Sequence, residues 1–319
     1  MNYIVLDLEW NQCPSGKEHE NPLLPFEIIE LGAVKLNEKK EVLGEFSKLI
    51  RPKVYHRLHH RTKQVLKTDF KEYLKAPGFL EVIKDFFNWC GDEPYIMCTW
   101  GPMDLEELQQ NMDFYKFNNP LPKPLYYYDI QKLFSLLYED GKSRRALSYA
   151  VEFLHLDTNE TFHQAIGDTR YTARIIQQMN MELVKEYESV DYHRPPSNKN
   201  EEIYMVFRRY AKYVSRVFDS KEAMLSDKTV TTTRCYQCGK ALRKKIRWFP
   251  GGNNMYYSLS ICPLHGYLKG KIRIKKTHDG KYFSVRTLKL VSESDAEIIR
   301  KKQESIQAKR KMKRKKQSE

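Results

Sequence analysis

The chain has 319 residues, of which 41% are hydrophobic and 13% are aromatic. This apolar content is enough to pack one large or two modest domains, and it excludes a chain that is disordered throughout. No apolar run approaches the ~20 residues that a membrane-spanning helix needs, and the first residues lack the basic and apolar regions of a signal peptide. We therefore expect a cytoplasmic protein with no membrane partner. Six cysteines in a chain of this length do not indicate a disulfide framework.

The net charge of +14 is divided unevenly along the chain. Residues 1–200 contain 25 basic and 30 acidic residues, a net charge of −5. Residues 201–319 contain 30 basic and 11 acidic residues, a net charge of +19. A basic segment of this kind most often binds nucleic acid, and acidic proteins or membrane surfaces are the next alternatives.

The first part of the chain shows strand and helix patterns in a characteristic order. A short apolar run at the start predicts a buried strand, and two β-rich runs separated by a polar turn at 37–40 predict the next two strands. In chain order, the predicted elements are strands at 3–6, 28–36 and 46–50, a helix at 79–90, a strand at 95–99, and helices beginning at 104 and spanning 145–154 and 168–181. This order indicates an α/β layer fold with a mixed sheet.

Four carboxylates and one histidine lie next to these predicted elements. Asp7 and Glu9 are two residues apart at the end of the first strand, so their side chains point to the same face of the sheet. Asp104 follows the next buried strand, and His163 precedes Asp168 by five residues at the start of a helix. Taken singly, such residues are more often exposed acids or polar helix caps. The set of five indicates a catalytic site.

In this order and spacing, the five residues resemble the DnaQ-like (DEDDh) 3′→5′ exonuclease family, over residues 1–182. Glu27–Val34 is similar to the second strand of that family, and Ser148–Leu154 to the helix before its last motif. The resemblance implies a ribonuclease H-like fold, in which helices flank a mixed sheet. It implies that His163 is the general base and that the metal ligands are Asp7, Glu9, Asp104 and Asp168. The surroundings are closer to the RNA-trimming branch than to polymerase proofreading subunits.

The chemistry of these groups agrees with what the resemblance implies. Four carboxylates in one cleft repel one another, and divalent cations neutralise them. Carboxylate oxygens suit Mg²⁺ or Mn²⁺, and two such ions ~3.5–4 Å apart stabilise the attacking and leaving oxygens of a phosphodiester. An imidazole, with an ordinary pKa of ~6.5, accepts a proton from the attacking water near neutral pH. We expect a nucleoside 5′-monophosphate as the product.

Two tryptophans lie beside the predicted acids. Trp10 and Trp100 are expected either to stack on the 3′-terminal bases of a substrate or to pack beneath the edge of the sheet. The chain departs from the family pattern at two places. Asn11-Gln12 stands where family members often have Thr or Ser, and Val65–Asp69 replaces the usual hydrophobic-Thr-Gly-Ile sequence. The contacts to the terminal sugar and to the 3′ end therefore stay open at the level of sequence.

The second part of the chain contains four residues with the spacing of a zinc ribbon. Cys235 and Cys238 are separated by 23 residues from Cys262 and His265, and a glycine follows each pair. Three thiolates and one imidazole match a closed tetrahedral site for one structural Zn²⁺ ion. Two disulfides or four unrelated residues are the alternatives.

Basic residues surround the predicted zinc ligands. The runs 243–249 and 269–276 mix bases with aromatic or β-branched residues, and the second run alternates, so that one face of the strand is basic. This composition suits single-stranded nucleic acid, and a solvated strand face that binds nothing is the alternative. After the exonuclease domain we expect a linker and a basic helix at 201–219 within 183–229, a zinc-ribbon-like nucleic-acid-binding β module at 230–292, and a basic tail at 293–319. The most basic stretch of the tail, 309–316, is expected to be disordered or a frayed helix when free.

The expected activity is metal-dependent 3′→5′ hydrolysis of RNA, either single-stranded or with a 3′ overhang. RNA is favoured over DNA because a basic module of its own suggests an enzyme that finds its own substrate. Two alternatives remain: a DNA 3′→5′ exonuclease in repair, and a non-catalytic RNA- or ribosome-binding adaptor. The 2′-hydroxyl distinguishes RNA from DNA, and the intact set of five residues argues against the adaptor.

Overall fold

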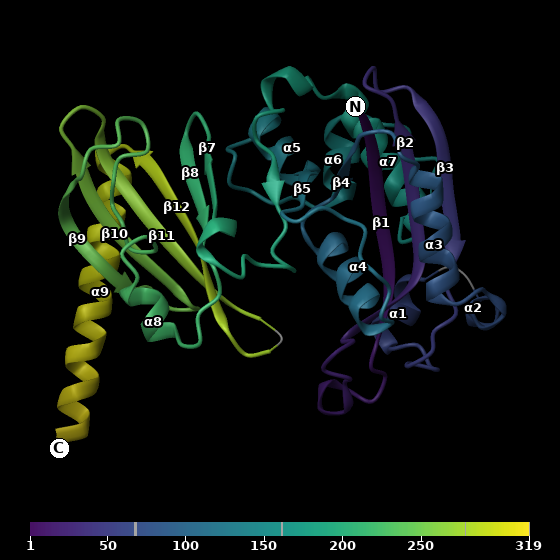
Figure 1. Cartoon of the computed structure of the whole chain (residues 1–319), viewed down its shortest axis with the longest axis horizontal. Coiled ribbons are helices and arrows are strands. Elements are labelled where there is room, and N and C mark those ends of the chain that lie inside the picture. Colours follow the sequence, from purple (N-terminus) through teal and green to yellow (C-terminus); the bar gives the residue numbers. More distant parts are fainter. Residues whose placement is uncertain (67–68, 161, 278, 319) are drawn as a thin grey trace. The chain divides into compact units, whose positions relative to one another are not determined.

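The computed structural model describes residues 1–66, 69–160, 162–277 and 279–318, with the backbone alone for 313–318. The chain forms two compact units, Met1–His193 (unit 1) and Arg194–Glu319 (unit 2), and each contains one six-stranded sheet (Figure 1). No helix in the described part of the chain combines the length and the apolar character needed to cross a membrane.

The sheet of unit 1 is mixed, with the strand order β3-β2-β1-β4-β5-β6. β1 lies near the middle, antiparallel to β2 and parallel to β4. The three strands predicted first in the sequence are present, and β2 and β3 pair as a hairpin across the predicted turn. The bounds are β1 (Asn2–Gln12), β2 (Phe26–Leu36), β3 (Val42–Leu49), β4 (Tyr95–Thr99), β5 (Tyr126–Asp129) and β6 (Ser189–Val190).

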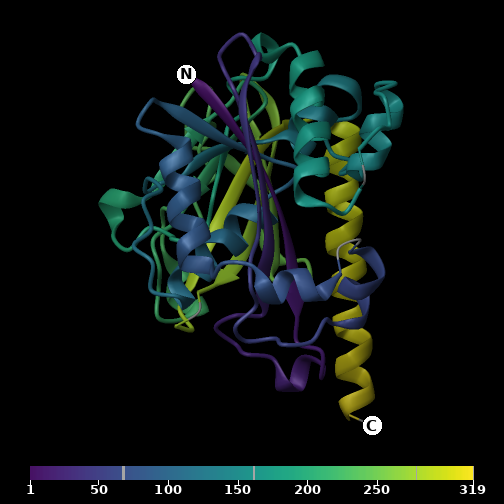
Figure 2. The same cartoon turned by 90° about the vertical axis from the view of Figure 1, so that its right-hand side faces the viewer.

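Helices cover both faces of this sheet. α3 and α4 share a core with Ile4, Leu6 and Leu8 of β1, whereas α7 packs against β1 and β2 on the other face. Figure 2 shows the blue α3 and the teal helices on opposite sides of the purple strands. The helices are α1 (His60–Val65), α2 (Phe70–Lys75), α3 (Phe79–Cys90), α4 (Met103–Phe114), α5 (Ile130–Tyr138), α6 (Leu147–Phe153) and α7 (Ala165–Gln178), with 3-10 turns at Lys17–His19 and Met181–Leu183. The predicted α/β fold with a mixed sheet is confirmed.

The start of α7 lies directly on β2 at Gly32. A Cβ atom at this position would be 2.5 Å from the backbone nitrogen of Ile166 and closer still to the carbonyl carbon of Ala165. The Thr169 hydroxyl donates a hydrogen bond to the Gly32 carbonyl oxygen at 3.1 Å, which fixes the first turn of the helix at this point. Because Gly32 is paired with Asp7 across the sheet, this contact sets the distance between α7 and the first acidic strand.

Unit 2 is an antiparallel sheet with the strand order β7-β8-β12-β11-β10-β9. Apolar clusters lie on both of its faces, one beneath α8 and one beneath α9. The bounds are β7 (Ile203–Val206), β8 (Tyr210–Val214), β9 (Arg243–Pro250), β10 (Met255–Cys262), β11 (Gly266–Lys276), β12 (Tyr282–Val291), α8 (Lys221–Ser226) and α9 (Glu293–Ser318), with a 3-10 turn at Lys199–Glu201. The sheet therefore extends beyond the module predicted at 230–292.

The basic helix predicted over 201–219 is wrong, because this segment forms the hairpin β7–β8. The two strands pair through Ile203 and Val214, and the Phe207 amide donates to the Tyr210 carbonyl oxygen at 2.8 Å to close the turn. β8 also pairs with β12, so that its backbone groups are satisfied by a strand more than sixty residues away. The apolar spacing fitted a helix locally, but pairing with the existing sheet overrides that preference.

The C-terminal segment is one long helix, α9, which agrees with the helical alternative for the basic tail and not with a disordered one. Its first turns pack on the sheet through Ala296 and Ile299, and Ile306 is the last apolar residue in contact with that cluster. Beyond this point α9 projects past the sheet (Figure 1). The packed turns supply the tertiary contacts that a highly charged helix needs in order to form.

We expect Gly32→Ala to lower the free energy of unfolding by about 1–3 kcal/mol, because the added methyl group forces α7 away from β2. Thermal and urea unfolding measure this effect. Gly44→Ala on β3 is the matched control, since its Cβ would meet only Trp89 Nε1 at 3.7 Å. Equal stability of the two variants would contradict the account of the α7 contact.

Candidate active site and candidate metal centre

β1 carries the first two predicted ligands past the end of its parallel neighbour. β1 pairs with β4 only up to Val5, which lies opposite Cys98. Its pairing with β2 continues through Asp7, which lies opposite Gly32. Asp7 and Glu9 therefore lie on the part of β1 that extends past the end of β4. Their side chains are on the face of β1 opposite Leu6 and Leu8. Both carboxylates are half-buried.

Asp104 reaches the same place from the first turn of α4. Its Oδ1 accepts a hydrogen bond from the Leu8 amide at 3.3 Å, which occupies a β1 backbone donor just beyond the end of β4. The Asp104 residue is 6% exposed. This hydrogen bond fixes the third acid beside Asp7 and Glu9, as the sequence predicts.

His163 and Asp168 come from the loop and the first turn that lead into α7. Asp168 Oδ2 accepts a hydrogen bond from the His163 amide at 3.1 Å, and His163 has a φ of 64°, in the left-handed region. Metal-ligating atoms of Glu9, His163 and Asp168 all lie within 4.8 Å of one another. The structure thus brings Glu9 together with two residues that lie 154 and 159 positions later in the chain, and His163 is exposed.

Burial, and then repulsion by the neighbouring carboxylates, raises the pKa of each acid at this site. Burial, then Glu30, Asp168 and Asp104, raise the pKa of Glu9 to about 8. Burial followed by Asp104 and Asp168 raises the pKa of Asp7 well above its ordinary value. Burial raises the pKa of Asp104 to about 7 and that of Asp168 to about 6. In the absence of cations, the site therefore binds protons at neutral pH.

The residues of this site fit divalent cations. Asp168 Oδ1 is buried and has no hydrogen-bond partner in the part of the chain that the structure describes. A buried carboxylate oxygen without a donor carries a large desolvation cost, and a hard cation offsets it. Four converging carboxylates have the donor chemistry of Mg²⁺ and Mn²⁺ sites.

Glu30 is a site residue that the sequence analysis did not identify. It lies opposite Glu9 in the β1–β2 pairing and is 6% exposed. Its carboxylate accepts hydrogen bonds from the Ala165 amide at 3.3 Å and from the Tyr73 hydroxyl. Glu30 thereby holds the start of α7, next to His163. No local pattern marked Glu30, because its place opposite Glu9 depends on the register between β1 and β2.

A second buried acid, Glu107, lies one helical turn after Asp104. Burial, then Glu106 and Asp104, raise the pKa of Glu107 to about 8. Its Oε2 has no hydrogen-bond partner among the described residues. The i, i+3 spacing on α4 places it on the same side of the helix as Asp104.

The two tryptophans pack on the protein on at least one side. Trp10 is half-buried against the core, and the centre of its ring lies 5.8 Å from the centre of the Phe26 ring. Trp100 donates from Nε1 to the Arg145 carbonyl oxygen at 3.1 Å, and its ring lies 6.0 Å from Phe134. The packing alternative therefore accounts for part of each ring.

The two departures from the family pattern have different outcomes. Asn11 is fully buried and binds the loop after β3: its Nδ2 donates to the Tyr55 and Arg57 carbonyl oxygens, and its Oδ1 accepts from the His59 amide. This amide thus shapes the loop beside the site. Of the altered segment Val65–Asp69, residues 67 and 68 lie outside the described residues.

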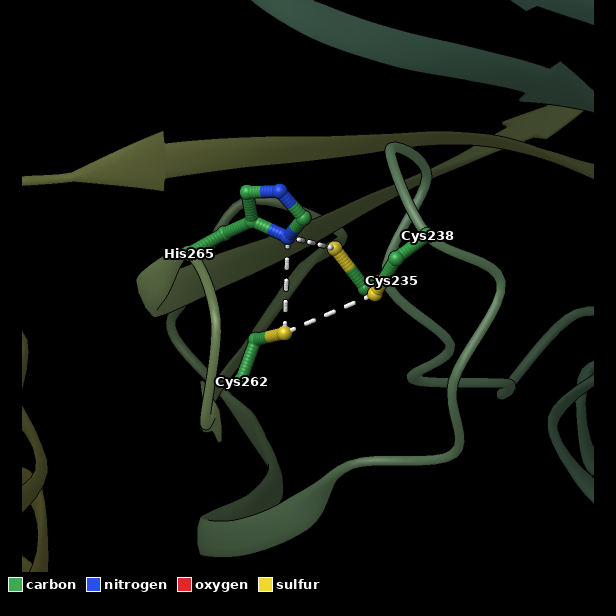
Figure 3. A group of neighbouring side chains, drawn as sticks. All are labelled: Cys235, Cys238, Cys262 and His265. Atoms are coloured by element: carbon green, nitrogen blue, oxygen red, sulfur yellow. Dashed lines mark hydrogen bonds between the residues drawn. The ribbon is translucent and has the colours of Figure 1, made fainter.

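Unit 2 contains the second predicted cluster, which joins a loop to a hairpin (Figure 3). Cys235 and Cys238 come from the loop before β9, and Cys262 and His265 from the turn between β10 and β11. His265 Nδ1 lies 3.5 Å from Cys235 Sγ and 3.6 Å from Cys262 Sγ, and Cys238 Sγ lies 3.7 Å from Cys262 Sγ. All six described cysteines are free thiols, so the disulfide alternative is wrong.

These separations match the edges that a tetrahedral zinc site would have. With Zn–S bonds of about 2.3 Å and Zn–N bonds of about 2.05 Å, ideal tetrahedral edges are about 3.75 Å between two sulfurs and about 3.55 Å between sulfur and nitrogen. Each of the three measured distances is within about 0.1 Å of its ideal edge. The donor set and its geometry therefore fit Zn²⁺.

The ribonuclease H-like fold of unit 1, with its carboxylates and histidine, is that of a DEDDh-type exonuclease. Residues 4–176, just over half of the chain, match the family model described as "Exonuclease" (RNase_T). The chain therefore belongs to this exonuclease family, and the DnaQ-like resemblance is confirmed.

Relatives and solved structures share parts of the chain. The probable 3′-5′ exonuclease KapD of Bacillus subtilis is 33% identical over 121 residues, 38% of this chain and 56% of that protein. The chain thus spans little more than half the length of this curated relative. The nuclease domain of 3′hExo, a DEDDh family member bound to rAMP, has a TM-score of 0.50, with 21% identity over 60% of this chain and 96% of that one.

A bacterial structure aligns over a longer part of the chain. E. coli exonuclease I in complex with a dA16 oligonucleotide has a TM-score of 0.48, with 12% identity over 81% of this chain and 54% of that one. At these identities, the solved structures describe the fold alone.

We expect Mn²⁺ to bind unit 1 more tightly as the pH rises from about 6 to about 8. The pKa values of Asp168, Asp104 and Glu9, about 6, 7 and 8, place proton release in this interval. Below this pH interval the carboxyl groups are protonated and bind the cation only weakly. Electron paramagnetic resonance of free Mn²⁺ measures the affinity at each pH. An affinity independent of pH would contradict the raised pKa values.

Proposed function

We propose that this protein is a metal-dependent 3′→5′ exonuclease that removes nucleoside 5′-monophosphates from the 3′ end of RNA. The observation that carries the proposal is the meeting of Glu9, His163 and Asp168 within 4.8 Å, on elements that also bring Asp7 and Asp104 to the site. Membership of the exonuclease family supports the same reaction.

Each residue has a distinct role in this proposal. Asp7, Glu9, Asp104 and Asp168 would hold two Mg²⁺ or Mn²⁺ ions, which supply a polarised water and neutralise charge on the phosphate. His163 accepts the proton of the attacking water, since its ring is exposed and its backbone is tied to Asp168. Glu30 keeps the start of α7 in place.

RNA is the proposed substrate, single-stranded or as a 3′ overhang. The support is the sequence similarity to the RNA-trimming branch and the separate unit with its excess of basic residues. The parts of Trp10 and Trp100 that are not packed on the core are the proposed contacts of the terminal bases. A DNA exonuclease is the alternative that the experiment below distinguishes.

We further propose that Cys235, Cys238, Cys262 and His265 bind one structural Zn²⁺ ion. The four donors leave no open position for a substrate, and their separations match tetrahedral edges. The ion would link the loop before β9 to the β10–β11 turn, and among the described residues no strand pairing joins these two segments. Its role is therefore to hold unit 2 in shape.

Asp168→Asn is expected to abolish stepwise 3′→5′ shortening of a 5′-labelled oligonucleotide, because the metal site loses a charge. His163→Gln should lower the rate by about 100-fold or more with metal binding retained. Matched RNA and DNA substrates, each with Mg²⁺ or Mn²⁺, give the sugar preference from their relative rates. Asp157→Asn, an exposed acid outside the proposed set of ligands, is the control.

Three results would contradict parts of this proposal. Faster cleavage of DNA would overturn the assignment to RNA, and undiminished activity of Asp168→Asn would overturn the site. Tight RNA binding without cleavage by the unmodified protein would establish the adaptor instead.

For the second metal, we expect about one equivalent of zinc in the purified protein and a large loss of zinc in Cys262→Ser. The same substitution should lower the unfolding temperature of unit 2, because zinc binding contributes to folding. Elemental analysis and calorimetry measure these effects independently of nuclease activity. Cys13→Ser, a buried cysteine in unit 1, is the control. A full complement of zinc in Cys262→Ser would refute the site.

A further inference from the structure

The two faces of β11 differ completely in character. Leu268, Ile272 and Ile274 are buried on one face, and the two isoleucines pack against α8 and the segment after it. Lys269, Lys271 and Arg273 alternate with them and therefore point to the other face. Successive basic side chains on this face are about 6.7 Å apart along the strand.

Neighbouring strands extend this face with more basic and polar residues. β12 places Lys289 opposite Lys269 and Thr287 opposite Lys271. β8 in turn places Lys212 opposite Thr287. Because paired residues in adjacent strands share a face, these side chains and those of β11 form one surface. Alternation in the sequence predicts the basic side of β11, but the residues that β12 and β8 add depend on the pairing of the strands.

α9 adds one more basic side chain to the same surface. Ala296, Ile299 and Ile306 form its apolar stripe, and Lys302 takes an inward position in that stripe where a third apolar turn would be expected. Lys302 Nζ lies 4.2 Å from the centre of the Tyr257 ring. Tyr257 is paired with Lys271 in the sheet, so the helix directs its lysine at the basic strand.

We call the set Lys269, Lys271, Arg273, Lys289 and Lys302 the basic face. Among the described residues, Lys271, Arg273, Lys289 and Lys302 form no ion pair with an acidic side chain. Burial, followed by Arg273, Lys269 and Lys302, lowers the pKa of Lys271. Like charges held this close repel one another, and a bound polyanion removes that repulsion.

We propose that the basic face binds the phosphate backbone of single-stranded RNA and so holds the substrate of the exonuclease. This inference rests on the proposed function for the identity of the ligand. A regular row of positive charges fits a polymer whose negative charges also repeat regularly, as the phosphates of a nucleic acid do. Acidic side chains on a folded protein have no such repeat.

Lys271→Gln/Lys302→Gln tests the proposal, in an Asp168→Asn background that stops cleavage. Fluorescence anisotropy with a labelled 20-nucleotide RNA gives the affinity at several salt concentrations. The loss of two phosphate contacts should make the slope of log K, the association constant, against log salt less negative by about 1.4. The same loss should weaken binding about 25-fold at 0.1 M salt.

Lys221→Gln/Lys228→Gln is the matched control. Lys221 is a helix lysine over Tyr256, with Nζ 5.6 Å from the ring centre, on the face of the sheet that α8 covers. The control removes the same charge as the test variant and should leave both the slope and the affinity unchanged. Equal effects of the two variants would overturn the proposal, as would tighter binding of polyglutamate than of RNA.

A second measurement separates this inference from the proposed function. In the catalytically intact protein, Lys271→Gln/Lys302→Gln should cleave a dinucleotide at the unmodified rate, because that substrate is too short to need the basic face. Unimpaired dinucleotide cleavage with unchanged RNA affinity would overturn the inference and leave the exonuclease intact. A protein that binds RNA through the basic face but cleaves nothing would overturn the proposed function alone.

Discussion

The close approach of α7 to β2 at Gly32 determines the geometry of unit 1. The missing side chain lets the backbone at Ala165 and Ile166 lie against the strand, and the Thr169 hydroxyl bonds to the Gly32 carbonyl oxygen. Asp168 therefore begins its helix beside the strand that carries Asp7 and Glu9. A larger residue at position 32 would separate the two halves of the site even if every ligand were present.

Electrostatic repulsion is the counterpart of this close packing. The site concentrates carboxyl groups whose pKa values are all raised, and Glu30 adds a further buried acid behind them. Such a group stabilises the folded state least when it is ionised, so the metal-free fold loses stability as the pH rises through the raised pKa values. Divalent cations reverse this dependence, because they favour the ionised form. The same arrangement thus costs stability and creates the metal affinity.

Local patterns predicted unit 1 well. α3 occupies the predicted range because Phe79, Val82, Ile83 and Phe86 repeat at helical spacing and all face the core. The candidate catalytic residues could be proposed as a set from the sequence, because each lies beside a recognisable strand end or helix start. The residues that hold this set in place could not be predicted. For example, the hydrogen bond that the Ala165 amide donates to Glu30 joins residues 135 positions apart. Nothing in the local sequence of Glu30 distinguishes it from an ordinary strand acid.

Unit 2 shows the opposite balance between local and long-range information. The clustering of the four proposed zinc ligands was predictable because they form two pairs that are close in sequence, and the basic strand because alternation is a local pattern. The hairpin β7–β8 was not, since its apolar spacing also fits a helix and only pairing with β12 decides between them.

The chemistry of the two donor sets keeps the two proposed metals apart. Thiolates select Zn²⁺ over Mg²⁺, whereas a cluster of carboxylate oxygens suits the harder ion. The Cys3His cluster is closed, so exchange there requires part of unit 2 to open, while the exposed His163 shows that the carboxylate site is accessible to solvent and substrate. A mild chelator would therefore remove the catalytic ions before the structural one. Loss of activity under such conditions reports on unit 1, with the fold of unit 2 intact.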